Sequence, residues 1–325
     1  MKALVVSGPD TGLELRTIPV PEPKHGEVLI RVSASPINPS DLLMISGDYG
    51  QSRAYPFVPG LEGSGTVVAT GGGFLGRSIL GKTVACAPEK DGLWSDYAVV
   101  PANRCLPLPK GMPEDVGAMS FVNPLAAIGL VQAAKDGGHR AVISTAAGGA
   151  LGRMIRQRAS KEGFTVINVV RREDQAAELR SMGVEHVLSS ASDAFDHDLR
   201  MLSADLGSSM AFDAVAGDMT GRLAEALLPN GEILVYGELS GQRSNFDPAT
   251  MTFKNLTIRG FWLTQWSKQT SFLKQLLLTR QIMQALENGF AQTRIARKVP
   301  LQNAVEAPAL YADDMSAGKV LIVPN

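Results

Sequence analysis

The chain has few of the residues that most often bind metals or form disulfides. Only two cysteines, Cys86 and Cys105, occur in 325 residues, and they form no C-x-x-C pair or cluster. A structural zinc lobe and a disulfide framework are therefore excluded. Because both cysteines lie in strand-like surroundings, we expect them to be small buried hydrophobic residues. The four histidines are scattered, and the sequence offers no three convergent ligands for a catalytic metal.

An excess of one charge and long apolar runs are also missing. The formal net charge is −1 and there is no basic block, so we expect no nucleic-acid partner. No segment approaches the roughly 18 uninterrupted apolar residues that span a bilayer. The apolar stretch in MKALVVSGPD is too short for a secretory signal and is typical of a first strand. We therefore expect a cytoplasmic protein with no membrane partner.

The length and the hydrophobic pattern indicate two domains. A chain of 325 residues exceeds the size at which a single core stops growing. Residues 1–120 alternate short β-like runs with Pro and Gly turns, which predicts a compact, partly closed antiparallel β domain. From residue 121, strands and helices alternate, which predicts a parallel sheet wound on both sides by helices. The expected strands of this sheet are Ala141–Ser144, Thr165–Val170, His186–Leu188, Ala211–Val215, Glu232–Tyr236 and Leu256–Arg259.

The C-terminal part predicts a return to the first domain. A helical stretch at 271–289 is followed by a closing strand, KVLIV, which is similar to the strands of the N-terminal part. We therefore predict a β-rich domain of residues 1–120 and 266–325, with an inserted α/β domain of residues 121–265. The cleft between the two domains is then the default active site.

Residues 140–172 have the pattern of a dinucleotide-binding unit, namely a strand, a glycine-rich turn, a helix and a second strand. Gly148 and Gly149 let the backbone turn tightly towards a pyrophosphate, and the helix N-terminus supplies free N–H groups. Ala150 departs from the glycine pattern of this turn, while Gly149 and Gly152 remain. An added methyl tightens the turn without removing a donor. The alternative is a plain turn before a helix, but the surrounding strands favour binding.

Two arginines at the end of the second strand indicate which dinucleotide is bound. An NAD site usually has an Asp or Glu there, which accepts from the ribose 2′-OH. This chain has Arg171 and Arg172 instead. A guanidinium pairs bidentately with a 2′-phosphate, whereas a carboxylate repels it, so we predict NADPH as the cofactor. The alternative is a solvated basic pair that Glu173 and Asp174 partly neutralise.

This arrangement resembles the medium-chain dehydrogenase/reductase superfamily over essentially the whole chain. PGLEGSG at 59–65, GKTVACAP at 81–88 and the closing GKVLIVP are typical of its zinc-free branch. In the zinc alcohol dehydrogenases a Cys precedes the segment matching SPINPSD, and a His precedes the Glu matching Glu62. Here residues 38–41 contain neither Cys nor His, and Leu61 precedes Glu62. The resemblance implies a GroES-like β-rich catalytic domain, an inserted Rossmann domain with a doubly wound parallel sheet, and no metal.

Three stretches are more similar to the 2-enoyl thioester reductases, which act on CoA or acyl-carrier-protein thioesters, than to quinone reductases. They are NPSDLLMISGDYG at 38–50, FVNP at 121–124 and RGFWLTQW at 259–266, and INVVRR at 167–172 agrees with them. The resemblance implies hydride addition to the β-carbon of an α,β-unsaturated carbonyl and protonation of the α-carbon. It places Tyr49 at the substrate as proton donor or carbonyl-orienting group. The cofactor residues that it implies are Asn123 by the nicotinamide ribose, with Gly148, Gly149, Ala150, Leu151, Arg171, Arg172, Glu173, Tyr236, Gly237, Glu238, Leu239, Phe261, Trp262, Leu263 and Lys319.

Each of these assignments has a plainer alternative. Tyr49 is otherwise an amphipathic rim residue, and Asn123, just before Pro124, is a common type of helix N-cap. Phe261 and Trp262 are otherwise core or subunit-interface packing, and Lys319 is otherwise a surface strand lysine.

Two other functions compete with the enoyl reductase. One is an NADPH:quinone oxidoreductase, which would tolerate loss of Tyr49 and prefer flat acceptors. The other is a non-catalytic NADPH-binding protein. The small-molecule substrate is thus an enoyl thioester, an enone or a quinone, and the loops at 49–57 and 263–272 are expected to select it. The resemblance also implies a homodimer through the exposed strand at 256–261, whose hydrophobic residues would otherwise invite uncontrolled pairing.

Overall fold

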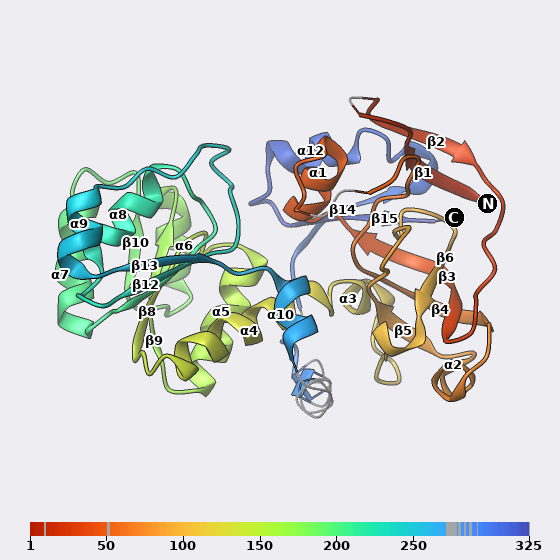
Figure 1. Cartoon of the computed structure of the whole chain (residues 1–325), viewed down its shortest axis with the longest axis horizontal. Coiled ribbons are helices and arrows are strands. Elements are labelled where there is room, and N and C mark those ends of the chain that lie inside the picture. The colour runs from red at the N-terminus through yellow and green to blue at the C-terminus, as the bar shows by residue number, and fades with distance from the viewer. Residues whose placement is uncertain are drawn as a thin grey trace. The chain divides into compact units, whose positions relative to one another are not determined.

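The structure is a computed structural model that describes residues 1–9, 11–50, 53–270, 278, 281–282, 284–285, 288–290 and 292–324. The chain divides into two compact units (Figure 1). The β-rich unit consists of Met1–Pro124 and Leu276–Asn325, and the α/β unit consists of Leu125–Gln275. The helix expected over 271–289 lies mostly outside the described residues. No helix in the described part of the chain is long and apolar enough to cross a bilayer.

The α/β unit is built on a six-stranded sheet in the order β10-β9-β8-β11-β12-β13. Every neighbouring pair is parallel, which confirms the expected sheet. Its strands are β8 (Ala141–Ser144), β9 (Thr165–Val170), β10 (Val187–Ser189), β11 (Met210–Asp213), β12 (Glu232–Val235) and β13 (Thr257–Gly260). Its helices are α4 (Val122–Asp136), which starts in the β-rich unit, then α5 (Ala150–Lys161), α6 (Glu173–Ser181), α7 (Phe195–Leu206), α8 (Asp218–Ala226), α9 (Pro248–Lys254) and α10 (Leu263–Gln269).

Burial on both faces explains the continuous apolar runs of the central strands. All four residues of β8 and all four of β11 are buried, as parallel strands covered on both sides require. Ile143 and Ile167 pack with Leu199 of α7 and Leu223 of α8 in one core cluster. The chain runs outwards from β8 to β10 on one side and from β11 to β13 on the other, so the strand order reverses between β8 and β11. The carboxyl ends at such a reversal are the usual ligand-binding edge of an open α/β sheet.

The β-rich unit has a two-stranded sheet, β1-β2, and a seven-stranded sheet in the order β14-β15-β3-β4-β5-β7, with β6 paired to β3. The strands are β1 (Lys2–Val6), β2 (Leu13–Thr17), β3 (Glu27–Pro36), β4 (Gly63–Thr70), β5 (Thr83–Cys86), β6 (Tyr97–Pro101), β7 (Cys105–Pro107), β14 (Ile295–Pro300) and β15 (Lys319–Val323). The helices are α1 (Pro39–Ser46), α2 (Phe74–Ile79), α3 (Glu114–Ala118) and α12 (Ala307–Asp313), with short 3-10 turns at Ala102–Arg104 and Leu301–Asn303.

The tail returns to this unit as the sequence predicts. β15 pairs antiparallel with β3, while β14 and β15 are parallel to each other, so the sheet is not wholly antiparallel. The two cysteines pair across β5 and β7 in the sheet register. Burial raises the pKa of both thiols, that of Cys105 to about 12. Both therefore remain neutral at ordinary pH, as expected for small hydrophobic residues.

Candidate functional site

A glycine-rich turn links β8 to α5 at the carboxyl edge of the parallel sheet. Ala146 has a left-handed φ of 50°, and α5 begins at Ala150 with no side chain capping its N-terminus. The first N–H groups of a helix have no acceptor within it, so those of α5 point to an anion site. The turn therefore fits the pyrophosphate of a dinucleotide.

Close packing explains which glycine at the start of α5 is required. A Cβ at Gly152 would lie 2.6 Å from the Cα of Ala147, so α5 can pack against the turn only if this residue is glycine. At Gly148 a Cβ would meet only Val170 Cγ1, at 3.7 Å. Ala150, the departure from the glycine pattern, is the first residue of α5 and keeps its N–H. The missing glycine thus leaves the anion site intact.

Arg156 supports the turn from within α5, and the sequence analysis missed it. Its guanidinium donates to the carbonyl oxygen of Ala147 and lies 3.5 Å from Oδ1 of Asn168. Burial lowers the pKa of Arg156 to about 10, so it stays charged at neutral pH. The amide of Asn168 is held by the carbonyls of Val166 and Glu185, at 3.0 and 3.2 Å. The sequence did contain one indication of this contact, because Asn168 is a polar residue inside the apolar strand TVINVV.

A second polar cluster, also missed, joins β8 and β11 at the reversal of strand order. The Asp213 carboxylate accepts from the N–H of Val215 at 2.9 Å and from the Thr220 hydroxyl at 2.8 Å. Thr145 accepts from the N–H of Ala214 at 2.8 Å. These bonds fix the ends of the two central strands beside the dinucleotide turn.

The parallel sheet brings most of the predicted cofactor residues to this same edge. Arg171 follows β9, Tyr236–Leu239 follows β12, and Phe261 follows β13. The N–H of Tyr236 donates to the carbonyl of Asp213, at 2.8 Å, which places the segment beside the end of β11. Their contacts with a cofactor remain a prediction.

The two arginines after β9 differ in their surroundings. Arg172 donates from Nε and Nη2 to the two carboxylate oxygens of Asp174, at 3.0 and 3.2 Å. Glu173 pairs with Arg180 at 2.6 Å. The side chain of Arg171 is exposed and makes no hydrogen bond or ion pair with any described residue. The neutralisation considered for both arginines therefore applies to Arg172, and Arg171 carries the free guanidinium.

The aromatic pair after β13 is divided between core and surface. Phe261 is 9% exposed and packs against α4, where a Cβ at Gly129 would lie 2.7 Å from its ring. Its ring centroid is 6.2 Å from that of Trp266. Trp262 is 36% exposed. The Phe261 side chain thus packs in the core, which was the plainer alternative for this residue. The strand before it, β13, is an outer strand of the sheet, where the dimer interface was predicted.

In the β-rich unit, Tyr49 lies in the turn that ends α1. Gly47 ends the helix with a left-handed φ of 85°, a conformation that glycine adopts without strain. The N–H of Tyr49 then donates to the carbonyl of Leu43, at 3.0 Å. Its side chain is half-buried against the cluster that contains Met44 and Phe57. The phenol is thus held by packing on a fixed turn.

Asn123 does not cap a helix, which corrects the simpler interpretation of that residue. α4 begins at Val122, so Asn123 lies within its first turn. The Glu62 carboxylate takes the capping role, because its Oε2 accepts from the N–H groups of Phe121 and Val122, at 3.2 and 2.8 Å. The Asn123 amide forms no hydrogen bond in the described part of the chain. It is therefore available to a ligand.

Lys319 is not a surface lysine, because it is only 5% exposed. Its Nζ donates to the carbonyl of Ile37, at 3.2 Å, and to Oδ1 of Asn38. The same Nζ lies 5.5 Å from the ring centroid of Tyr311. The cofactor role that the resemblance implies for Lys319 remains a prediction, and the structure shows its ammonium paired inside the β-rich unit.

The residues at the place of the zinc ligands do not fit a zinc site. Asn38 and Glu62 bond to each other, with Nδ2 to Oε1 at 3.0 Å, and Leu61 carries no donor atom. Across the ranges that the structure describes, no three His, Cys, Asp or Glu side chains gather into a metal site.

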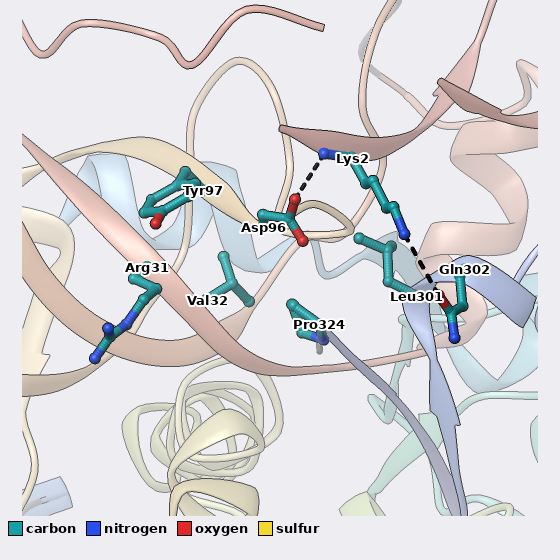
Figure 2. Close-up of a pocket in the computed structure, with 8 residues that line it drawn as sticks. All are labelled: Lys2, Arg31, Val32, Asp96, Tyr97, Leu301, Gln302 and Pro324. Carbon is teal, nitrogen blue, oxygen red and sulfur yellow. Dashed lines mark hydrogen bonds between the residues drawn. The ribbon is translucent and has the colours of Figure 1, made fainter. Parts of the chain in front are cut away.

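A pocket of about 500 Å³ in the β-rich unit is lined by none of these residues (Figure 2). The Lys2 N–H donates to Asp96, at 2.6 Å, and its ammonium lies 3.4 Å from Gln302 Oε1. The pocket is lined by Lys2, Arg31, Val32, Asp96, Tyr97, Leu301, Gln302 and Pro324. None of these is a predicted site residue, so the pocket is not the candidate site.

Comparisons with known proteins agree with this fold. Residues 24–110 match the alcohol dehydrogenase GroES-like domain, and residues 150–277 match the family described as zinc-binding dehydrogenase. The mitochondrial enoyl-[acyl-carrier-protein] reductase of Bos taurus is 30% identical over 299 residues, covering 90% of this chain and 79% of that protein.

Solved structures show the same fold over the full length. A proposed NADPH:quinone reductase from Mesorhizobium loti has a TM-score of 0.89 and 33% identity, covering 100% of this chain and 98% of its own. The quinone oxidoreductase from Thermus thermophilus, solved also with NADPH, has a TM-score of 0.76 and 26% identity, covering 99% of this chain and 100% of its own. The two-domain fold, the dinucleotide edge and these relatives together show that the chain belongs to the medium-chain dehydrogenase/reductase superfamily of oxidoreductases, whose cofactor is a nicotinamide dinucleotide.

Proposed function

We propose that the protein is an NADPH-dependent reductase of the C=C bond of α,β-unsaturated carbonyl compounds, with a 2-enoyl thioester as substrate. The observation that carries the cofactor choice is the Arg171 side chain, which has no partner among the described residues and stands where an NAD site has a carboxylate. The Thermus relative solved with NADPH supports the same choice. The name of the bovine relative, an enoyl-[acyl-carrier-protein] reductase, supports the substrate class.

Each residue has a definite task in this proposal. The N–H groups at the start of α5 bind the pyrophosphate, Arg171 binds the 2′-phosphate, and Asn123 holds the nicotinamide ribose. When bound, NADPH supplies the hydride that the β-carbon of the substrate accepts. Tyr49 donates a hydrogen bond to the carbonyl oxygen, where negative charge develops, or a proton to the α-carbon. A phenol held by packing can do this without reorganising during the reaction.

A quinone is the second candidate acceptor. The Mesorhizobium and Thermus relatives support it by their names, since both are assigned to quinone reduction. A quinone accepts electrons into a planar ring and needs no proton delivered to carbon, so its reduction would not depend on Tyr49. This difference separates the two activities experimentally.

The deciding experiment is a screen of acceptors with the purified protein, in which NADPH oxidation is followed by absorbance. Crotonyl thioesters, simple enones and quinones are compared at equal concentrations, each with NADPH and with NADH. We expect the thioester to have the highest kcat/KM and NADPH to be preferred. Turnover of quinones alone would establish the second candidate. Cofactor binding without turnover of any acceptor would indicate a non-catalytic NADPH-binding protein.

We also propose a cytoplasmic homodimer that pairs through β13. The strand is at the edge of the sheet, and most of its residues are exposed, which leaves backbone groups available for pairing. Sedimentation of the wild type and of a variant with a new charge on an exposed residue of the strand, Thr257→Lys, tests the interface. Fractionation of cells tests the location.

A further inference from the structure

A buried cluster of polar side chains in the β-rich unit takes no part in the hydride and proton transfers proposed above. It consists of Asn38, Glu62 and Lys319, which we call the Glu62 network. Their exposed fractions are 2%, 0% and 5%. Lys and Glu are almost never fully buried unless they are paired, so the chain maintains this network at a cost in desolvation.

The Glu62 carboxylate connects two segments that are far apart in the sequence. Its Oε1 accepts from Nδ2 of Asn38, at 3.0 Å, and its Oε2 accepts from the N–H groups of Phe121 and Val122. A carboxylate at this point satisfies N–H groups that have no acceptor in the helix and opposes the positive end of the helix dipole. It therefore fixes where α4 begins, and the next residue is Asn123.

The second segment leads to Tyr49. Asn38 immediately precedes α1, and its N–H donates to the buried Asp41 carboxylate, at 2.8 Å. At the other end of this eight-residue helix, the N–H groups of Asp48 and Tyr49 both donate to the carbonyl of Leu43, at 2.9 and 3.0 Å. A short helix fixed at both ends transmits a displacement of Asn38 to Tyr49.

Lys319 determines how the Asn38 amide is oriented. An ammonium can only donate and a carboxylate can only accept, so the amide must turn its oxygen to Lys319 and its nitrogen to Glu62. Both bonds are present. The Lys319 ammonium is thus the counter-charge of the Glu62 carboxylate, and the Asn38 amide links the two groups. Only one orientation of this amide can bond to both of them.

We propose that Glu62 is a positioning residue, which places Tyr49 and Asn123 relative to each other through Asn38 and the start of α4, with Lys319 as its counter-cation. This inference rests on the proposed function, because it assigns a purpose to the placement of those two residues. The competing explanation is that the network only stabilises the β-rich unit.

A double-mutant cycle separates the two explanations. Glu62→Gln keeps the size of the side chain but replaces one acceptor oxygen with an NH₂ that faces donors. We expect it to lower kcat for crotonyl thioester reduction about 10- to 100-fold, with KM changed less than about threefold. In a Tyr49→Phe background the same change should cost less than about threefold more. If the loss of kcat in the double variant equalled the product of the losses in Glu62→Gln and Tyr49→Phe, the two residues would act independently and the proposal would be overturned.

Two further variants control for folding. Ser35→Ala removes a buried 2.6 Å hydrogen bond to the backbone carbonyl of Glu62 without touching the carboxylate, and kcat should stay within about twofold. Glu62→Gln leaves the Lys319 ammonium without its counter-charge, so it can fail to fold. The pair Glu62→Gln with Lys319→Met removes both charges, and it should be stable but still slow. If both kcat and the unfolding midpoint of this double variant returned to the wild-type values, the result would contradict a positioning role for Glu62.

Hydrogen exchange tests the coupling without any turnover. Glu62→Gln should speed exchange about tenfold or more at the amides of Phe121 and Val122 and also raise exchange in the segment 38–50, whereas Ser35→Ala should leave both segments unchanged. Unchanged exchange in Glu62→Gln would refute the inference for any acceptor. Failure of the wild type to reduce any enoyl thioester would refute the proposed function alone.

Discussion

Arg171 and Arg172 are adjacent in sequence, yet we expect replacement of Arg171 to be far more costly for NADPH binding. Arg172 is already bonded through two nitrogens to Asp174, whereas the Arg171 side chain has no partner in the described ranges. A hydrogen bond between charged groups contributes about 1.5–3 kcal/mol, and 1.4 kcal/mol corresponds to a factor of ten in affinity. Arg171→Ala should therefore weaken NADPH binding about 10- to 100-fold.

The same reasoning gives the neighbouring variants and the control. Arg172→Ala should weaken NADPH binding about fivefold or less, the scale of an exposed ion pair. Asp174→Asn should strengthen it slightly, because the carboxylate no longer occupies Arg172 or repels the phosphate. NADH lacks the 2′-phosphate, so its affinity should be unchanged in all three variants. Arg200→Ala, which breaks an exposed ion pair with Glu225 in the same unit, is the matched control.

Fluorescence titration with NADPH and NADH at low and high salt measures these differences. The Arg171 contribution should shrink as salt is added, because exposed charges are screened. Equal losses of NADPH and NADH affinity in Arg171→Ala would refute the reasoning. They would show that the arginine stabilises the carboxyl edge of the sheet and does not bind the 2′-phosphate. A larger loss from Arg172→Ala would show that the Asp174 pair opens on binding.

Four further outcomes are expected. Tyr49→Phe should cut enoyl thioester reduction about 100-fold with little change in NADPH affinity, while Tyr55→Phe, its neighbour in the loop, should not; equal rates would remove Tyr49 from the reaction. Gly152→Ala should destabilise the protein by about 1–3 kcal/mol in urea unfolding because its Cβ meets backbone, whereas Gly148→Ala should not. Burial raises the pKa of Asp41 from 3.8 to about 7, so the folded protein binds this proton more tightly than the unfolded chain does. The free energy of unfolding should therefore fall, by up to about 4 kcal/mol, as pH rises from about 4 to about 7. The same dependence of unfolding free energy on pH in Asp41→Asn would contradict this. A chelator should leave activity intact, and metal analysis should find no stoichiometric zinc; loss of activity restored by zinc would show a metal site.

Local patterns in the sequence were enough to predict the α/β unit. The strands at Ala141–Ser144 and Thr165–Val170 match residue for residue, because a parallel strand buried on both faces is a short apolar run bounded by polar or turn residues. The glycine-rich turn was also local information. The position of Arg171 at the sheet edge followed directly from these elements.

Contacts between distant segments could not be predicted in this way. The Glu62 network joins residues 24 and 281 positions apart, and no local pattern specifies such pairs. The N-cap interpretation of Asn123 was wrong for the same reason, since the start of α4 is capped by Glu62, 60 residues before Val122. The surface interpretation of Lys319 was wrong for a similar reason, because its burial depends on the strands that surround β15.

The most direct test of the account is a single turnover of crotonyl thioester with NADPH deuterated at the transferable C4 position, followed by mass spectrometry and NMR of the product. Run in ordinary water, the reaction should place one deuterium on the β-carbon and none on the α-carbon, and Tyr49→Phe should slow it without moving the label. Absence of saturated product, or deuterium on the α-carbon, would contradict the central claim that the chain directs hydride to the β-carbon and a proton to the α-carbon.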